Sequence, residues 1–368
     1  MSYARIAVLL LGAVLLAAAC QPGAASADWK TPPNKDAAKT QIEAGFQTYG
    51  MPDSWANYGA SITAFCQKNW TFDCLSKRTD TDMSSAEEIQ RFDGEKNNPI
   101  AVMADIGIQF GPIAETIGVV PEYLPPNASA LPEGFKSKTG GWVGTFVGVP
   151  GFVVNTDVME DKGIPVPRTW ADLTKPEYKG LVGIGQVGKS GTATTSFIAM
   201  TLAAGGSIED FGPGVTFAKS LLANIEGVKE GAAEDLEKGE IPIQIKYDFN
   251  LLAAAEAVKE KGVNAEVVIP SDGSLYAASA LMVNKYNTAK MDFAKMFMEW
   301  VLTDEGQTVF AEFGARPVRY VLGDLQLPDA AKAKWLPDDM YANVEQVDIT
   351  KVSIDQIAEI WNGQVLGQ

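Results

Sequence analysis

One segment of the sequence matches a motif that binds nucleotide phosphates. Residues Gly183–Ser190 read G-I-G-Q-V-G-K-S, which fits the pattern G-x-x-x-x-G-K-[ST] of a P-loop and lies between a predicted strand and a predicted helix. In a P-loop enzyme, Lys189 would contact the β- and γ-phosphates and Ser190 would bind Mg²⁺. A nucleotide hydrolase is therefore one function that this segment permits.

Three junctions between loops and predicted helices carry side chains that suit an anion of any kind. They begin at residues 53, 82 and 190, and each brings hydroxyl or amide groups to a helix start, where backbone N–H groups and the helix dipole favour negative charge. Each serine or threonine is also a common N-cap, which is the alternative interpretation. The candidate ligand-binding residues of these junctions are Trp55, Asn57, Tyr58, Ser84, Ser85, Ser190, Gly191 and Thr192.

Further candidates follow a strand predicted later in the chain. Tyr247, Asp248 and Asn250 lie where this strand ends and a helix begins, at the edge where α/β sheets bind ligands. Asp248 would accept a hydrogen bond from a hydroxyl or an amine, unless Asp248 or Asn250 only caps the helix. Aromatic faces with a few polar groups suit a compact polar solute. On this ground the remaining candidates are Gln109, Phe110 and Tyr276.

Composition excludes several classes of function. The chain of 368 residues contains no histidine, which removes Ser-His-Asp and Cys-His catalysis and imidazole proton transfer. It has 30 Lys and Arg against 46 Asp and Glu, a net charge of −16, so attraction to nucleic acid is disfavoured. We expect no catalytic residue, no metal site, no cofactor and no nucleic-acid partner.

The N-terminal segment predicts export. Residues 1–27 contain one charged residue, Arg5, then the apolar run Ile6–Ala19 and the small residues Ala25-Ser26-Ala27, which is the pattern of a signal peptide. The apolar run is shorter than the ~20 residues of a membrane-spanning helix. Cleavage after Ala27 would release a periplasmic protein, whereas cleavage before Cys20 would leave a lipid anchor on that residue.

Either cleavage leaves two cysteines, Cys66 and Cys74. Because an exported chain meets an oxidising compartment, the sequence predicts a disulfide between them. The alternative is two unpaired buried thiols.

The elements that must position the candidate residues alternate between strands and helices, which predicts an α/β architecture with mostly parallel sheets. Strands are predicted at 100–108, 181–184, 241–245, 265–269 and 278–283, and helices at 86–92, from 113, and at 192–204, 251–261 and 289–302. Asp304 is predicted to cap the next helix and Gly314 to end it.

A series of motifs follows one order along the chain. Phe152–Thr156 precedes Pro167–Leu173 (P-R-T-W-A-D-L), Pro176–Gly180 (P-E-Y-K-G) and Ser190–Thr192, and near the C-terminus come Phe297–Trp300, Thr303–Gln307 and Gly314–Arg319. In this order the motifs resemble the extracellular solute-binding proteins of ABC importers, in the branch that handles ferric iron, polyamines and sugar phosphates. The resemblance covers about residues 40–325.

The resemblance implies the type II periplasmic-binding-protein fold, with two lobes that each have a mixed sheet flanked by helices. Hinge strands near Val149–Val154 and Ala277–Met282 would let the lobes close on one solute without catalysis. The expected domains are a signal peptide at 1–27, the first part of lobe 1 at 40–150, lobe 2 at 151–277, a return to lobe 1 at 278–325 and a C-terminal extension of open role at 326–368.

The implied partners are a small polar solute, with an anionic phosphate or carboxylate group, and an ABC permease in the inner membrane, to which a monomer would deliver it. Polyamine or ferric-ion binding by the same fold is the alternative. The pair of adjacent tyrosines of ferric-binding members is absent, because Asp248 follows Tyr247. Polyamine binding usually requires several acidic residues, and only Asp248 can be placed in the binding site from the sequence.

Overall fold

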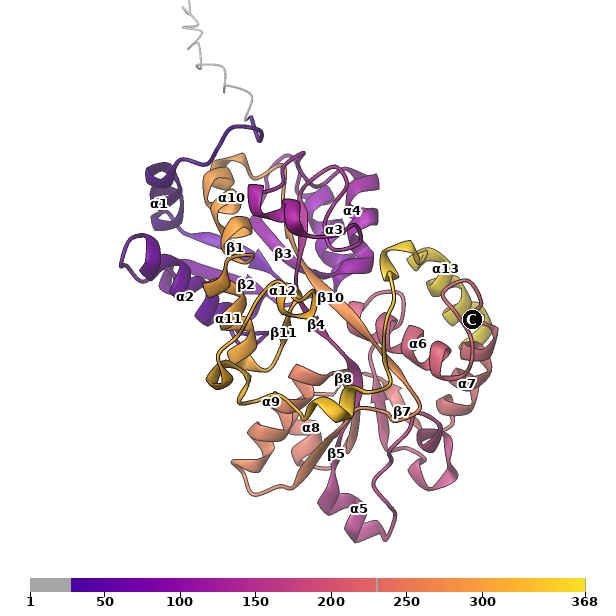
Figure 1. Ribbon diagram of the computed structural model, residues 1–368. Coiled ribbons are helices and arrows are strands. Elements are labelled where there is room, and N and C mark those ends of the chain that lie inside the picture. The colour runs from indigo at the N-terminus through magenta and orange to yellow at the C-terminus, as the bar shows by residue number, and fades with distance from the viewer. Residues whose placement is uncertain (1–27, 230, 368) are drawn as a thin grey trace, which may run out of the picture.

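The computed structural model describes residues 28–229 and 231–367, so the predicted signal peptide and Cys20 lie outside the described residues. Two β-sheets, each flanked by helices, form the upper and lower parts of the molecule in Figure 1. The predicted α/β class with two mixed sheets is confirmed.

The first sheet holds strands from the N-terminal part of the chain together with later strands that return to it. In order across the sheet these are β11 (Arg316–Pro317), β4 (Trp142–Gly148), β10 (Ser274–Val283), β3 (Ala101–Gly107), β1 (Phe46–Tyr49) and β2 (Arg78–Thr81), and β12 (Val344–Gln346) pairs with β10 outside this path. Every residue of β3 is buried, which fits a central strand covered on both faces.

The second sheet is formed by the middle of the chain. Its strands in order are β7 (Ile225–Val228), β6 (Val182–Ile184), β8 (Ile243–Tyr247), β5 (Pro150–Asn155) and β9 (Ala265–Val268).

The expectation of mostly parallel sheets was wrong. β10 runs antiparallel to β3 and β4, and β5 runs antiparallel to β8 and β9. These strands enter their sheets directly from the other sheet, so no helical crossover sets their direction as it does in a βαβ unit.

The strands of the two sheets are joined by two crossings of the chain. Val149 alone separates β4 of the first sheet from β5 of the second, and the chain returns between β9, which ends at Val268, and β10, which begins at Ser274. A hinge at these crossings stays a prediction.

Helices cover each sheet. With the first sheet lie α1 (Lys35–Glu43), α2 (Tyr58–Asn69), α3 (Ser85–Gly94), α4 (Gly111–Ile117), α10 (Met291–Trp300), α11 (Asp304–Phe313) and α12 (Val318–Val321). With the second lie α5 (Thr156–Lys162), α6 (Gly191–Ala203), α7 (Gly212–Leu222), α8 (Ala233–Glu237) and α9 (Asp248–Lys259). The last elements are α13 (Ile354–Glu359) and the π-helix η10 (Ile360–Val365), and η10 lies beside α7.

Helix α6 is buried on nearly all sides, although it is rich in hydroxyl residues. Thr194, Thr195 and Ser196 each donate a hydrogen bond to the carbonyl four residues earlier, at 2.7–2.9 Å. The hydroxyls are thereby satisfied inside the helix, which allows a polar sequence to pack in the core.

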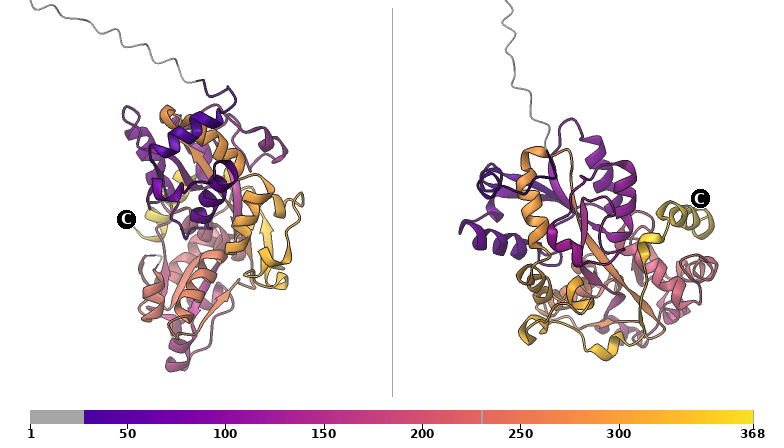
Figure 2. Two further views of the ribbon diagram at one scale, coloured as in Figure 1. Left: turned by 90° about the vertical axis from the view of Figure 1, so that its left-hand side faces the viewer. Right: turned by 45° about the horizontal axis from the view of Figure 1, so that its top comes forward.

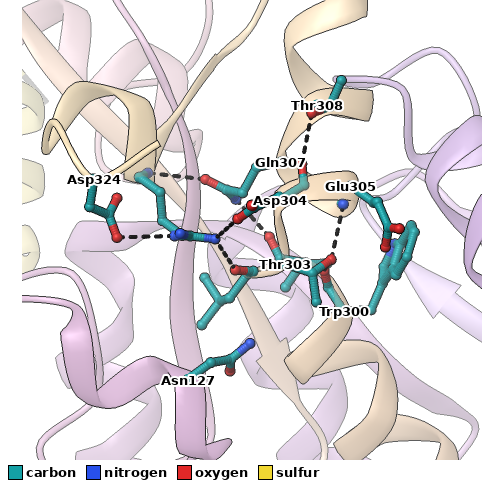
Figure 3. A network of polar contacts seen from close by, with 12 residues as sticks. Asn127, Trp300, Thr303, Asp304, Glu305, Gln307, Thr308 and Asp324 are labelled. Atoms are coloured by element: carbon teal, nitrogen blue, oxygen red, sulfur yellow. Dashed lines mark hydrogen bonds and ion pairs between the residues drawn. The ribbon is translucent and has the colours of Figure 1, made fainter. Parts of the chain in front are cut away.

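The closing helices α10 and α11 meet in a polar network (Figure 3). The hydroxyl of Thr303 accepts from the Gly306 N–H at 3.1 Å, so Thr303 rather than Asp304 is the N-cap of α11. The Asp304 carboxylate instead accepts from Arg319 Nη1 at 2.7 Å. The prediction for Asp304 was therefore off by one residue, because threonine, which is also a good N-cap, precedes it. Gly314 ends α11 as predicted.

Two further expectations can be compared with the described residues. Cys66 and Cys74 form a disulfide with their Cα atoms 6.0 Å apart, which confirms the predicted pairing. Among the helices of residues 28–229 and 231–367, none is long and apolar enough to cross a membrane.

Candidate functional site

A cavity of about 800 Å³ lies between the two sheets. The N-terminal ends of α3, from the first sheet, and of α6 and α9, from the second, line it, together with the segment before α2. Because these elements come from both sheets, the cavity is the place where the two halves of the protein face one another.

The start of α3 is fixed by its own side chains. The Ser84 hydroxyl and backbone N–H both donate to the Glu87 carboxylate, at 2.7 and 2.9 Å, which forms the carboxylate half of a capping box. Ser85 Oγ accepts from the Gly107 N–H at 3.1 Å and ties the helix to the end of β3. Both serines line the cavity.

The start of α6 lies close to this point. Ser190 Oγ accepts from the Ala193 N–H at 3.2 Å and so caps the helix. A Cβ atom on Gly191 would lie 3.1 Å from Ser85 Oγ and 3.2 Å from the Gly107 Cα. Glycine therefore lets two helix N-termini approach across the gap between the sheets, and their dipoles favour an anion there.

The loop before α6 does not have the backbone of a phosphate-binding P-loop. The Gly188 N–H donates to Thr194 Oγ1 at 2.9 Å, and the Lys189 and Ser190 N–H groups both donate to the Gln186 carbonyl, at 3.2 and 2.9 Å. Lys189 lines a second cavity of about 630 Å³. Because these amides already have partners, they are not available to surround a phosphate.

Asp105 is the buried acid of the first wall. Its two oxygens accept from Tyr58 Oη at 2.7 Å and from Trp55 Nε1 at 2.8 Å. Burial raises the pKa of Asp105 to about 7, against the lowering effect of these hydrogen bonds. Asp105 and Trp55 both line the cavity, so a carboxyl and an aromatic ring stand side by side in its wall.

A second acid lies behind this wall. Glu88 is fully buried, and burial, together with the nearby charge of Asp105, raises the pKa of its carboxyl well above the usual range. A Cβ on Gly50, which has a φ of +60°, would lie 1.7 Å from Glu88 Oε1. Position 50 therefore requires glycine on grounds of both space and backbone conformation.

The second wall contributes Lys246, Tyr247 and Asn250. Lys246 Nζ donates to the Gly231 carbonyl at 2.6 Å, and Tyr247 Oη donates to Thr195 Oγ1 at 2.9 Å. Asn250 Oδ1 is buried and has no hydrogen-bond partner within the described part of the chain. A solute hydroxyl or amine would satisfy it.

The structure brings together the predicted residues that stand at the helix starts. Those in the cavity lining are Trp55, Ser84, Ser85, Ser190, Gly191, Thr192, Tyr247 and Asn250. Their role in ligand binding stays a prediction.

The other predicted residues lie outside this lining. Asn57 donates to the Val309 carbonyl at 2.9 Å, and Tyr58 is buried behind the wall as a partner of Asp105. Gln109 and Phe110 are buried and line the second cavity, whereas Tyr276 lines a smaller cavity beside Arg316.

Asp248 is also outside the lining and is buried among protein groups. Its Oδ1 accepts from the N–H groups of Val149 and Phe249, at 3.0 and 2.9 Å, and its Oδ2 accepts from Tyr341 Oη at 2.7 Å. Burial raises its pKa, although these hydrogen bonds act in the opposite direction. The contacts of Asp248 thus join the crossing point of the chain to the C-terminal extension.

Sequence reasoning did not single out several residues of the lining. Asp105 is the one acid within the apolar strand β3, and Lys246 is the one cation of β8; a lone charge in a buried strand is a signal that could have found both. Asp82 and Ser54 stood within the junctions considered but were not chosen. Among the described residues, no group of three acids or cysteines has the geometry of a metal site.

Known proteins resemble this chain in sequence and in fold. The sequence pattern of a family described as bacterial extracellular solute-binding protein matches residues 110–344. An uncharacterized protein of Haemophilus influenzae is 32% identical over 237 residues, and this match spans 61% of the chain and 64% of that relative. A probable ABC transporter periplasmic-binding protein of Sinorhizobium fredii, y4fP, is 26% identical over 74% of the chain and 73% of its own length.

Among solved structures, the periplasmic binding protein AfuA of Actinobacillus pleuropneumoniae, with fructose-6-phosphate bound, has a TM-score of 0.70. The identity is 21%, and the match covers 88% of this chain and 98% of that one. This likeness concerns the fold.

Proposed function

Because the chain belongs to the bacterial extracellular solute-binding proteins, a family of binding proteins rather than enzymes, we propose that its cavity captures a small organic solute with an anionic group. The solute would be delivered to the permease of an ABC importer. Export through the predicted signal peptide, with or without a lipid anchor at Cys20, is part of the same proposal.

The observation that carries the proposal is the meeting of the α3 and α6 N-termini at one cavity. Ser85, Ser190 and Thr192 stand there, and the Gly191 backbone approaches Ser85 closely, whereas the Ser84 hydroxyl already donates to Glu87. Hydroxyl groups and helix N-termini hold phosphate or carboxylate without a formal cation, and each charge–dipole contact stabilises by roughly 0.3–1 kcal/mol.

The rest of the lining favours a solute body with hydrogen-bond donors. Asp82, just before α3, offers carboxylate oxygens, and Asn250 of the second wall offers an unpaired amide oxygen, whereas the oxygens of Asp105 already accept from Trp55 and Tyr58. The Trp55 ring adds an apolar face of the kind on which sugar rings pack. A sugar phosphate, or a compact phosphate or carboxylate that carries an amine or hydroxyls, combines these features.

The test is calorimetry on purified mature protein with fructose 6-phosphate, citrate, spermidine and ferric citrate, after mass spectrometry of any co-purified ligand. We expect binding of an anionic organic solute and none of spermidine. Binding of spermidine or ferric ion alone would contradict the proposal and support the alternative within the same fold.

A pair of double variants tests the place of the site. Ser190→Ala/Thr192→Ala should weaken binding at least tenfold, or about 1.4 kcal/mol. Thr216→Ala/Ser220→Ala on α7 is the matched control, because both of its hydroxyls are exposed and donate only within their own helix. Ser190 also caps α6, so affinity is compared well below the melting temperature of each variant.

A further inference from the structure

The C-terminal segment 324–367, here called the strap, touches both sheets in turn. It begins on the first-sheet side, where Asp324 accepts from Arg319 Nε at 3.1 Å (Figure 3). Leu325, Leu327 and Ala331 then pack with Ala311 of α11, and the Trp335 indole donates to the Ala311 carbonyl at 3.2 Å.

The strap next reaches the second sheet at the crossing point of the chain. Tyr341, which is 7% exposed, donates to Asp248 Oδ2 at 2.7 Å, and Asp248 Oδ1 accepts from the Val149 N–H. The Arg316 guanidinium of β11 lies 4.0 Å from the centre of the Tyr341 ring. Tyr341 therefore contacts the first sheet and the start of α9 at once.

Beyond Tyr341 the strap returns to the first sheet and then crosses to the second sheet again. β12 pairs in parallel with Ser274–Tyr276 of β10, and η9 (Ile349–Lys351) packs on η2 (Ile108–Phe110) at the end of β3. The chain then passes to the second sheet, where the Trp361 ring lies 5.3 Å from Phe197 of α6. Figure 1 shows the end of the strap beside α6 and α7, away from α11, where the strap begins, and Figure 2 shows the same yellow end of the chain from two further sides.

We propose that the strap ties the two sheets together and limits how far the cavity can open, with the Tyr341–Asp248 contact as its central anchor. Its anchors alternate between the sheets, so a rotation that separates the sheets must stretch the strap or release an anchor. The free energy of that release is added to the free energy of opening, which shifts the population toward the closed form.

The inference does not depend on which solute binds, so it is tested on ligand-free protein. The variants are Tyr341→Phe, which keeps the ring under Arg316 and removes the hydroxyl, and Trp361→Ala, which removes the last anchor. Tyr320→Phe is the matched control, because Tyr320 packs on Trp335 within the first-sheet side. Circular dichroism and thermal melting establish that each variant is folded.

Small-angle scattering and amide exchange are the readouts. We expect a larger radius of gyration for both strap variants than for wild type and Tyr320→Phe. In Tyr341→Phe we also expect amide exchange of Val344–Gln346 to be about tenfold faster, because a buried hydrogen bond to a carboxylate is lost. A radius of gyration and exchange rates equal to those of wild type in folded Tyr341→Phe would overturn the proposal, even if Trp361→Ala failed to fold.

Discussion

Gln109 and Gly191 form a hydrogen bond that joins the two sheets beside the cavity. Gln109 Nε2 donates to the Gly191 carbonyl at 3.0 Å and to Thr195 Oγ1 at 3.1 Å, and the residue is 1% exposed. Gln109 lies in η2, directly after β3, whereas Gly191 begins α6. This contact fixes the position of the α6 N-terminus relative to the first sheet.

Gln109→Leu should therefore weaken ligand binding about tenfold, because the side-chain volume is kept while both hydrogen bonds are lost, and the observed position of α6 against the first sheet becomes less stable. Calorimetry with the tightest ligand of the panel would measure it. Gln90→Leu is the control, since Gln90 has an exposed side chain on α3. Wild-type affinity in Gln109→Leu would show that this contact does not position the site.

Gly191→Ala should lower affinity without lowering thermal stability. The new Cβ would be only 3.1–3.3 Å from Ser85 and Gly107, so the sheets would have to stand a few tenths of an ångström further apart. Because Gly191 has a helical backbone, alanine there would stabilise the protein by roughly 0.4–1 kcal/mol by restricting the unfolded chain, which offsets this cost.

The matched control for this change is Gly94→Ala at the exposed end of α3, where a Cβ meets nothing within 4 Å. We expect it to keep wild-type affinity in calorimetry. If Gly94→Ala lost as much affinity as Gly191→Ala, the close approach of the two sheets at Gly191 would not be the cause.

The helix starts at residues 84 and 190 could be located from the sequence because N-caps are local signals. Serine before a helix is readable without knowledge of the fold, and both serines lie in the cavity lining. The neighbours of Gln109 and Asp248 could not be read in this way. Their partners, Gly191 and Tyr341, are 82 and 93 residues away in the sequence, and only the packed fold brings them together.

The same difference between local signals and long-range contacts explains the errors in the predicted fold. Alternating strands and helices indicate an α/β protein, but strand direction depends on whether the chain returns to the same sheet. Val149 is a single residue between strands of different sheets, and no local pattern marks it as such a crossing. The course of the strap depends likewise on long-range contacts of Tyr341 and Trp361.

Removal of the Cys66–Cys74 disulfide should destabilise the protein by about 2–3 kcal/mol in the chain-entropy estimate for so short a loop. Urea unfolding of Cys66→Ser/Cys74→Ser, compared with wild type, would measure the difference. Dithiothreitol should lower the stability of wild type and leave the double variant unchanged. Equal unfolding midpoints of the wild-type protein with and without the reductant would contradict this estimate.

Asp105 should make stability fall as the pH rises from about 4 to about 7. Its pKa is about 7 in the folded protein against 3.8 for an unperturbed aspartate. Between these values the unfolded chain has lost the proton and the folded protein still holds it, so unfolding releases a proton and is favoured by rising pH. The stability contribution of the neutral carboxyl is fully present below 3.8 and is lost as the pH approaches about 7.

Asp105→Asn removes this titration and is the variant that tests it. The difference in free energy of unfolding, Asp105→Asn minus wild type, should rise with pH between 4.5 and 7 by up to about 1.4 kcal/mol per pH unit. Urea unfolding at several pH values measures it. Titrations that do not depend on Asp105 cancel in the difference, whereas Glu88, whose pKa is raised partly by the charge of Asp105, also contributes to it. Asp93→Asn, near the end of α3, is the control for the loss of a carboxylate elsewhere in the same half of the protein. A flat difference for Asp105→Asn would mean that Asp105 is ionised throughout this range and that the hydrogen bonds from Trp55 and Tyr58 outweigh its burial.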